Sequence, residues 1–127
     1  MRVCIEMLIA VVDDDAMVRA ALVRFLRASG FLALAFRSGE EFLGWSYSQR
    51  PGCAVVDMDL PGLNGLEILE RLGDREEPVP CILITGWNGD STRGRAMSKG
   101  AVAFIRKPVE AEELLSALSL AVSSCGR

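Results

Sequence analysis

The sequence predicts an α/β protein in which five βα units form a doubly wound parallel sheet. Short apolar runs alternate with longer segments whose apolar residues recur at helical spacing. The runs are continuous rather than alternating, which is typical of parallel strands covered by helices on both faces. They are Met7–Val12, Phe31–Phe36, Cys53–Val56, Pro80–Ile84 and Ala101–Ile105. With 127 residues, 50% of them hydrophobic, the chain is long enough for one domain with its own core.

The first apolar run is followed by a segment, Ala16–Ser29, that predicts an amphipathic helix. Val18 and Leu22 share its apolar face, arginines occupy the other side, and Gly30 ends it. Asp15 stands directly before this segment, where a carboxylate caps a helix by accepting amide hydrogens of the first turn.

The second and third units carry similar helix signals. Ser38, with Glu41 three residues later, predicts a capping box and a helix that carries Phe42. Asn64–Leu72 predicts a short third helix with leucine and isoleucine on one face. The polar stretch 73–78 predicts a solvated loop.

The last two units differ in the quality of their helices. Asp90–Lys99 offers only Ala96 and Met97 as clear apolar contacts, and Gly94 falls in its middle. Helices take most of their stability from an apolar face, so this segment predicts the least stable helix. The final helix, Glu110–Ser123, carries several leucines on one face.

Composition excludes several classes of function. The chain has no histidine, which rules out a histidine-ligated zinc site, a Ser-His-Asp triad and a histidine phosphocarrier. A net charge of −3 argues against nucleic acid as a partner of this segment, because phosphate binding needs clustered positive charge. The apolar run Met7–Val12 is too short to span a membrane. We therefore expect a cytoplasmic protein that does not bind membranes.

The four cysteines predict no metal site. Cys4, Cys53, Cys81 and Cys125 are widely separated and form no CxxC motif. Cys53 and Cys81 begin apolar runs, which indicates buried, reduced thiols.

Polar residues follow four of the five apolar runs, at the carboxyl ends of the predicted strands. They are Asp13 and Asp14 after the first run, Asp57 and Asp59 after the third, Thr85 after the fourth and Lys107 after the fifth. Ligands of such sheets bind beyond the carboxyl ends of the strands. Crowded carboxylates repel one another and need a cation, and all-oxygen ligation suits Mg²⁺. A carboxylate beside Mg²⁺ is a competent nucleophile toward phosphorus, which gives an aspartyl phosphate.

Four segments at these strand ends carry a family resemblance. They are Asp13-Asp14, Val55-Val56-Asp57-Met58-Asp59-Leu60-Pro61-Gly62, Ile84-Thr85-Gly86 and Phe104-Ile105-Arg106-Lys107-Pro108. In this order they make essentially the whole chain resemble the receiver domain of two-component response regulators. The Thr-Gly pair and the Gly-Ala-Val-Ala-Phe-Ile text are similar to the nitrogen-fixation type. The resemblance implies a CheY-like, flavodoxin-like fold with strand order 2-1-3-4-5. It also implies one receiver domain over residues 1–127, with no effector domain in this chain.

The resemblance also implies a role for each site residue. Asp57 is the phosphoacceptor for a partner histidine kinase. The implied Mg²⁺ ligands are Asp13, Asp14, the Asp57 carboxylate and the main-chain carbonyl of Asp59. Thr85 and Lys107 contact the phosphoryl oxygens, and Thr85 and Phe104 form the switch. We expect a cis Lys107–Pro108 bond, as in the family, which would aim the lysine into the pocket.

The resemblance further implies a signalling switch rather than an enzyme, with only self-phosphorylation and self-dephosphorylation chemistry. Phosphorylation would change the surface of the fourth helix and fifth strand. That surface would control an effector or partner, or form a homodimer.

Three site residues have alternative interpretations. Phe104 is also suited to a plain core position. Asp59 adds negative charge near the incoming phosphoryl group, and its carboxylate either binds Mg²⁺ or slows the reaction. Trp87 is bulkier than the residue often found there in the family, and we expect it part-exposed at the rim of the site.

Three rival functions remain open at this point. Asp57-Met58-Asp59 also resembles the haloacid-dehalogenase phosphohydrolase signature, although that motif normally lies near the N-terminus of a longer chain. A degenerate receiver would act by protein contacts without phosphorylation. A flavodoxin-like FMN protein would need a hydroxyl- and glycine-rich loop where this chain has three acids.

Overall fold

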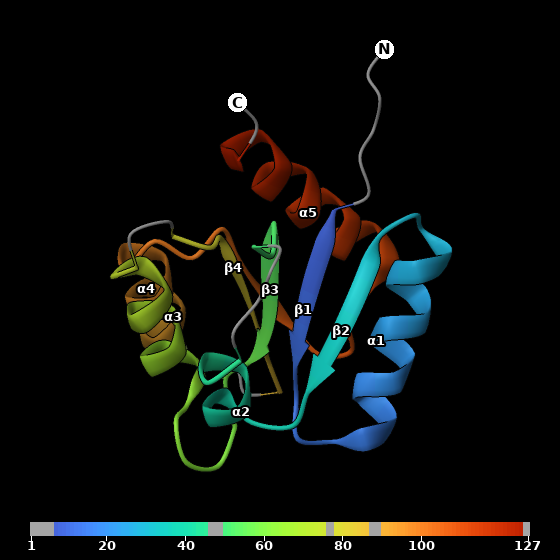
Figure 1. Cartoon of the computed structure of the whole chain (residues 1–127). Coiled ribbons are helices and arrows are strands. Elements are labelled where there is room, and N and C mark those ends of the chain that lie inside the picture. The colour runs from blue at the N-terminus through green and yellow to red at the C-terminus, as the bar shows by residue number, and fades with distance from the viewer. Residues whose placement is uncertain (1–6, 46–49, 76–77, 87–89, 126–127) are drawn as a thin grey trace.

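A computed structural model describes residues 7–45, 50–75, 78–86 and 90–125 and contains a five-stranded parallel sheet flanked by helices (Figure 1). The strands are β1 (Leu8–Val12), β2 (Leu32–Phe36), β3 (Cys53–Asp57), β4 (Cys81–Thr85) and β5 (Ala103–Arg106). The helices are α1 (Ala16–Ala28), α2 (Gly39–Leu43), α3 (Gly65–Gly73), α4 (Asp90–Ser98) and α5 (Ala111–Cys125). The strand order is β2-β1-β3-β4-β5, which confirms the predicted topology.

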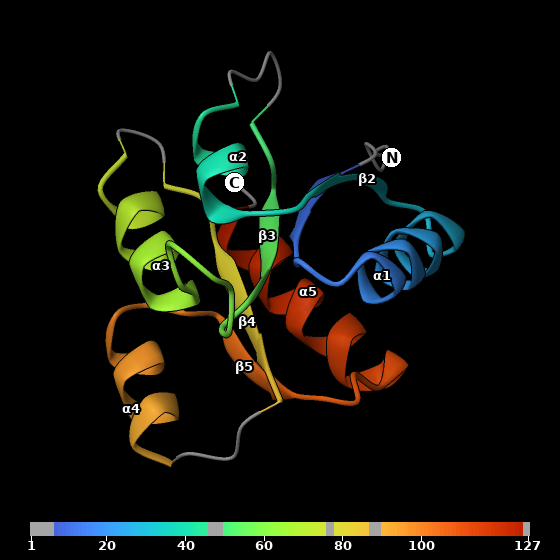
Figure 2. The ribbon, with the colours of Figure 1, turned by 90° about the horizontal axis from the view of Figure 1, so that it is seen from below.

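The helices form one layer on each face of the sheet. α1 and α5 cover one face, and α2, α3 and α4 cover the other, as Figure 2 shows. Every residue of β1, β3 and β4 is buried, as continuous apolar runs predict. β2 differs because it is an edge strand, and its Leu32 and Leu34 are 41% and 40% exposed.

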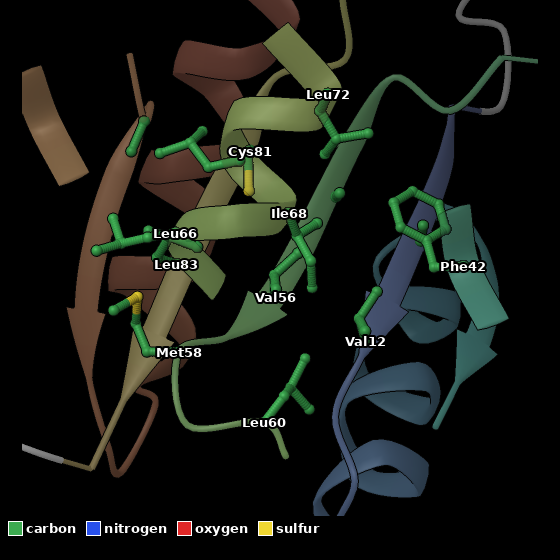
Figure 3. Packing of buried hydrophobic residues seen from close by; sticks show 14 of the residues in the cluster. Val12, Phe42, Val56, Met58, Leu60, Leu66, Ile68, Leu72, Cys81 and Leu83 are labelled. Atoms are coloured by element: carbon green, nitrogen blue, oxygen red, sulfur yellow. The ribbon is translucent and has the colours of Figure 1, made fainter. Parts of the chain in front are cut away.

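The core on the α2–α3–α4 face is built from strand and helix side chains that point toward one another (Figure 3). Ile68 and Leu72 of α3 are fully buried against this face, together with Val56 and Leu83 of the sheet. Fully burying one such side chain stabilises the fold by about 1.5–3 kcal/mol. Cys53 and Cys81 are buried in the core, as predicted.

α1, α2 and α3 begin at side-chain caps, and the sequence predicts the first two of these caps. The Asp15 carboxylate accepts hydrogen bonds from the backbone N–H groups of Met17 and Val18, so it caps α1 as expected. Ser38 accepts from the Glu41 N–H group, but the Glu41 carboxylate accepts from the Arg37 N–H group and not from that of Ser38. The predicted capping box is therefore only half formed.

A complete capping box occurs instead at α3, where sequence analysis did not predict one. The Asn64 side chain accepts from the Glu67 N–H group, and the Glu67 carboxylate accepts from the Asn64 N–H group. Gly62, with φ +77°, makes the turn that leads into this helix. These residues fix the loop between Asp57 and α3.

β5 and α4 differ slightly from what the sequence predicts. β5 runs over Ala103–Arg106, later than the predicted 101–105, because Ala101 instead donates its N–H group to the Ala96 carbonyl. In α4, Ala96 is buried as predicted, but Met97 is 40% exposed. No helix of the described residues combines the length and apolar character needed to cross a membrane.

The carboxyl ends of all five strands lie at the lower edge of the sheet in Figure 1 and face the viewer in Figure 2. This follows from parallel pairing, since each strand starts at the same edge. The described residues that end or directly follow β1, β3, β4 and β5 therefore meet at one edge of the sheet.

Candidate functional site

The site begins with three carboxylates from two adjacent strands. Asp13 follows β1 and is 1% exposed, and Asp57 ends β3 and is 4% exposed, whereas Asp14 is exposed. Oxygens of these three carboxylates lie within 4.8 Å of one another. The first turn fixes Asp13, because its Oδ1 atom accepts from the Asp15 N–H group at 2.9 Å. The Asp57 Oδ1 atom accepts from the Asp59 N–H group at 3.0 Å.

Lys107 places a cation against the two buried carboxylates. Its Nζ atom lies 3.3 Å from Asp57 Oδ2 and 3.7 Å from Asp13 Oδ2. The Lys107 N–H group donates to the Thr85 carbonyl at 2.7 Å, which joins the end of β5 to the end of β4. The Lys107–Pro108 bond is cis, as predicted.

Burial and charge shift the pKa values of this cluster. Burial, together with the negative charges of Asp57 and Asp14, raises the pKa of Asp13 against the opposing Asp15 hydrogen bond and the Lys107 charge. Burial alone lowers the pKa of the Lys107 ammonium. The negative charges of Asp57, Asp13 and Asp59, with the hydrogen bond to Asp57, outweigh burial and leave that pKa raised. Lys107 therefore stays charged at neutral pH, yet one ammonium cannot neutralise three neighbouring carboxylates.

Thr85, at the end of β4, contacts Asp59 in the loop after β3. Thr85 is 2% exposed, and its Oγ1 hydroxyl donates to Asp59 Oδ2 at 3.3 Å. The Gly86 N–H group donates to the same oxygen at 3.4 Å. The sequence predicts Asp59 and Thr85 in one site, but it does not predict this contact, because the contact depends on the path of the loop after β3.

Phe104 and Trp87 complete the set of predicted residues. The Phe104 side chain is buried in the core on the α3–α4 face, and its carbonyl accepts from Arg93 of α4 at 3.3 Å. Trp87 lies outside the described residues, so its expected position at the rim stays a prediction. The structure thus brings Asp13, Asp14, Asp57, Asp59, Thr85 and Lys107 together at one edge.

An apolar groove of about 390 Å³ adjoins this edge between α1 and the start of α5. Val18, Leu22 and Phe25 of α1 line one side, and Pro108 and Leu114 line the other. Lys107 borders the groove, but none of the clustered carboxylates lines it. The clustered carboxylates therefore lie outside the groove, and Lys107 is the site residue that borders both.

The arrangement has the parts required for transfer of a phosphoryl group to a carboxylate. A buried carboxylate at the centre can act as a nucleophile. The Lys107 ammonium lies beside it, and the Thr85 hydroxyl lies at the end of the adjacent strand. Such groups stabilise the charge that develops on transferred phosphoryl oxygens.

Curated proteins of known function are similar in sequence to most of this chain. Among curated relatives, the transcriptional regulatory protein FixJ of Rhizobium meliloti is 37% identical over 111 residues, which is 87% of this chain and 54% of that protein. The response regulator protein TmoT of Ectopseudomonas mendocina is 32% identical over 92% of this chain and 53% of its own length. The chain therefore spans about half the length of these relatives.

Solved structures are also similar to this chain over most of its length. A crystal structure of FixJ-N superposes with a TM-score of 0.85 at 34% identity, covering 94% of this chain and 96% of that one. A BeF3-activated DrrB receiver domain gives a TM-score of 0.83 at 26% identity, covering 94% and 99%. The family model of the response regulator receiver domain matches residues 9–119. The chain therefore belongs to the response regulator receiver domain family.

Proposed function

We propose that this receiver takes a phosphoryl group from a partner histidine kinase onto Asp57. The observation that carries the proposal is the Asp57 carboxylate itself. It ends a fully buried strand, is 4% exposed, and lies 3.3 Å from the ammonium of Lys107. In the transfer, an Asp57 oxygen forms the new P–O bond while the P–N bond to the kinase histidine breaks, and the imidazole leaves with that electron pair.

The donor set fits Mg²⁺ as the cofactor. Asp13, Asp14 and Asp57 offer hard oxygen ligands within 4.8 Å of one another, with more negative charge than Lys107 neutralises. We assign these three carboxylates and the main-chain carbonyl of Asp59 as the ligands. Bound Mg²⁺ would offset charge on the carboxylates and on the phosphoryl oxygens.

The remaining residues would respond to the new group. Lys107, whose Nζ atom lies 3.3 Å from Asp57 Oδ2, and the Thr85 hydroxyl at the end of the adjacent strand would contact the phosphoryl oxygens. Thr85 and Phe104 would act together as the switch. Leu83, two residues before Thr85 on the same strand, is the direct register partner of Phe104. Movement of Thr85 would thus reach the surface formed by α4 and β5.

That surface is the proposed output of the domain. In α4, Met97 is exposed and Arg93 donates to the Phe104 carbonyl, so the helix is tied to the switch strand. We propose that phosphorylation alters this surface to engage a partner, an effector or a second copy. The receiver would work in the cytoplasm as a single-turnover switch and would not itself contact nucleic acid or membrane.

Intact-mass spectrometry after incubation with acetyl phosphate and Mg²⁺ tests the proposal. We expect one added phosphoryl group that hydroxylamine removes, because acyl phosphates react with that nucleophile. Asp57→Asn should abolish the addition, whereas Asp74→Asn, the same change at the end of α3, should leave it intact. Full modification of Asp57→Asn would contradict the assignment. Repeated turnover of p-nitrophenyl phosphate would favour a phosphohydrolase instead.

A further inference from the structure

The Asp59 carboxylate occupies two hydrogen-bond donors at the edge of the site. Its Oδ2 atom accepts from the Thr85 hydroxyl at 3.3 Å and from the Gly86 N–H group at 3.4 Å. Both distances exceed the usual range of about 2.7–3.2 Å, so these hydrogen bonds are weak. Thr85 is buried, whereas Asp59 is exposed and can turn away into solvent.

These donors are of the kind that binds a phosphoryl oxygen. A hydroxyl, a backbone N–H group and an ammonium are the usual partners of such an oxygen. The negative charge of Asp59 also contributes to the raised pKa of Lys107, so the carboxylate acts on the ammonium as well. One anionic group therefore interacts with all three of these donors.

The Asp59 carboxylate lies outside the group of three carboxylates that we assign to Mg²⁺. Within the part of the chain that the structure describes, the cluster of close carboxylate oxygens consists of Asp13, Asp14 and Asp57. The Asp59 side chain is directed toward Thr85 and Gly86 instead. Its contacts are therefore those of an anion bound to donors, and not those of a metal ligand.

We propose that the Asp59 side chain is an internal competitor for the phosphoryl group. It occupies the Thr85 and Gly86 donors in the unphosphorylated receiver and must leave them when a phosphoryl oxygen binds. The shorter, charge-assisted hydrogen bonds of a phosphoryl oxygen would displace the weak Asp59 contacts. This role of Asp59 rests on the proposed function. The Asp59 side chain would set how strongly the site holds its phosphoryl group.

Two variants separate the hydrogen bond from the charge. Asp59→Ala removes both, whereas Asp59→Asn keeps an acceptor oxygen and removes the charge. Asp74→Asn, at an exposed position after α3, is the control for a change in net charge. None of these substitutions alters the main-chain carbonyl that we assign to Mg²⁺.

The first measurement uses metal-free, unphosphorylated protein and therefore does not depend on phosphorylation. In amide NMR spectra, Asp59→Ala should move the Gly86 proton upfield and speed its exchange, because the hydrogen bond is lost. Asp74→Asn should leave this amide unchanged. A Gly86 amide that is the same in wild type and Asp59→Ala would overturn the contact and the proposal with it.

The second measurement titrates beryllofluoride, an analogue of the phosphoryl group, in the presence of Mg²⁺. Asp59→Ala and Asp59→Asn should bind it about two- to fivefold more tightly than wild type, the range that one exposed charge interaction supports. Unchanged or weaker binding in both variants would overturn the competitor alone. A wild-type protein that binds no beryllofluoride would overturn the proposed function as well.

Discussion

At the scale of single residues, the site is defined by an imbalance of charge. Asp13 and Asp57 are buried beside each other with one ammonium between them, and Asp14 and Asp59 add further negative charge. Burial disfavours ionisation of the Asp13 carboxyl, and the negative charges of Asp57 and Asp14 add to this effect, which is why the pKa of Asp13 is raised. The buried charge therefore lowers the stability of the metal-free protein, and a bound cation or a proton removes this destabilisation.

This cost predicts that Asp13→Asn stabilises the metal-free protein at neutral pH, by about 0.5–2 kcal/mol. Because the folded-state pKa of Asp13 lies above its ordinary value of 3.8, its protonated form stabilises the fold. That contribution is complete below pH 3.8 and is lost as pH rises through the folded-state pKa. The advantage of the variant should therefore vanish as pH falls toward 3.8.

Urea denaturation at several pH values, with a metal chelator present, measures this difference. Asp15→Asn is the matched control, because asparagine caps a helix about as well as aspartate and this side chain is exposed. A metal-free Asp13→Asn protein that is less stable than wild type at pH 7 would contradict the charge account.

At the scale of elements, α4 has the smallest apolar face of the long helices. Among its described side chains, 92–98, Ala96 is the buried apolar contact, whereas α5 buries Leu114, Ala117, Leu118 and Ala121. Gly94 lies in its middle, and a Cβ atom there would meet nothing within 4 Å. Since helices depend on such burial, α4 should open more often than α5.

Gly94→Ala should stabilise α4 by about 1 kcal/mol, because glycine is that much less favourable than alanine inside a helix. Amide hydrogen exchange of residues 90–98 should then slow about fivefold. Gly73→Ala, at another helical glycine with open space, is the control and should leave α4 exchange unchanged. Exchange in wild-type α4 as slow as in α5 would show that the helix is not the weak element.

At the scale of the whole molecule, the continuous apolar runs predict a parallel sheet covered by helices on both faces, and the family resemblance implies the strand order that the structure has. β1, β3 and β4 are buried as their composition predicts. The exposed leucines of β2 were not predicted, since a run of apolar residues does not reveal which strand is at an edge. Membership of the receiver family also removes the support for a phosphohydrolase or an FMN protein.

The candidate site was predicted less completely than the fold. Strand ends converge by topology, so Asp13, Asp57, Thr85 and Lys107 could be placed together from sequence. The contact of Asp59 with Thr85 could not, because it depends on the conformation of a loop that is set by caps and turns. Those local hydrogen bonds involve common polar residues whose spacing alone does not identify a partner.

Locating the phosphoryl group in the chain tests whether Asp57 is the phosphoacceptor. Protein treated with acetyl phosphate and Mg²⁺ is reduced with borohydride, which converts an aspartyl phosphate to homoserine, and its peptides are sequenced by mass spectrometry. If Asp57 is the phosphoacceptor, homoserine appears at position 57 and unmodified aspartate remains at positions 13, 14 and 59. Homoserine at any of those three positions, or at none of the four, would contradict this assignment.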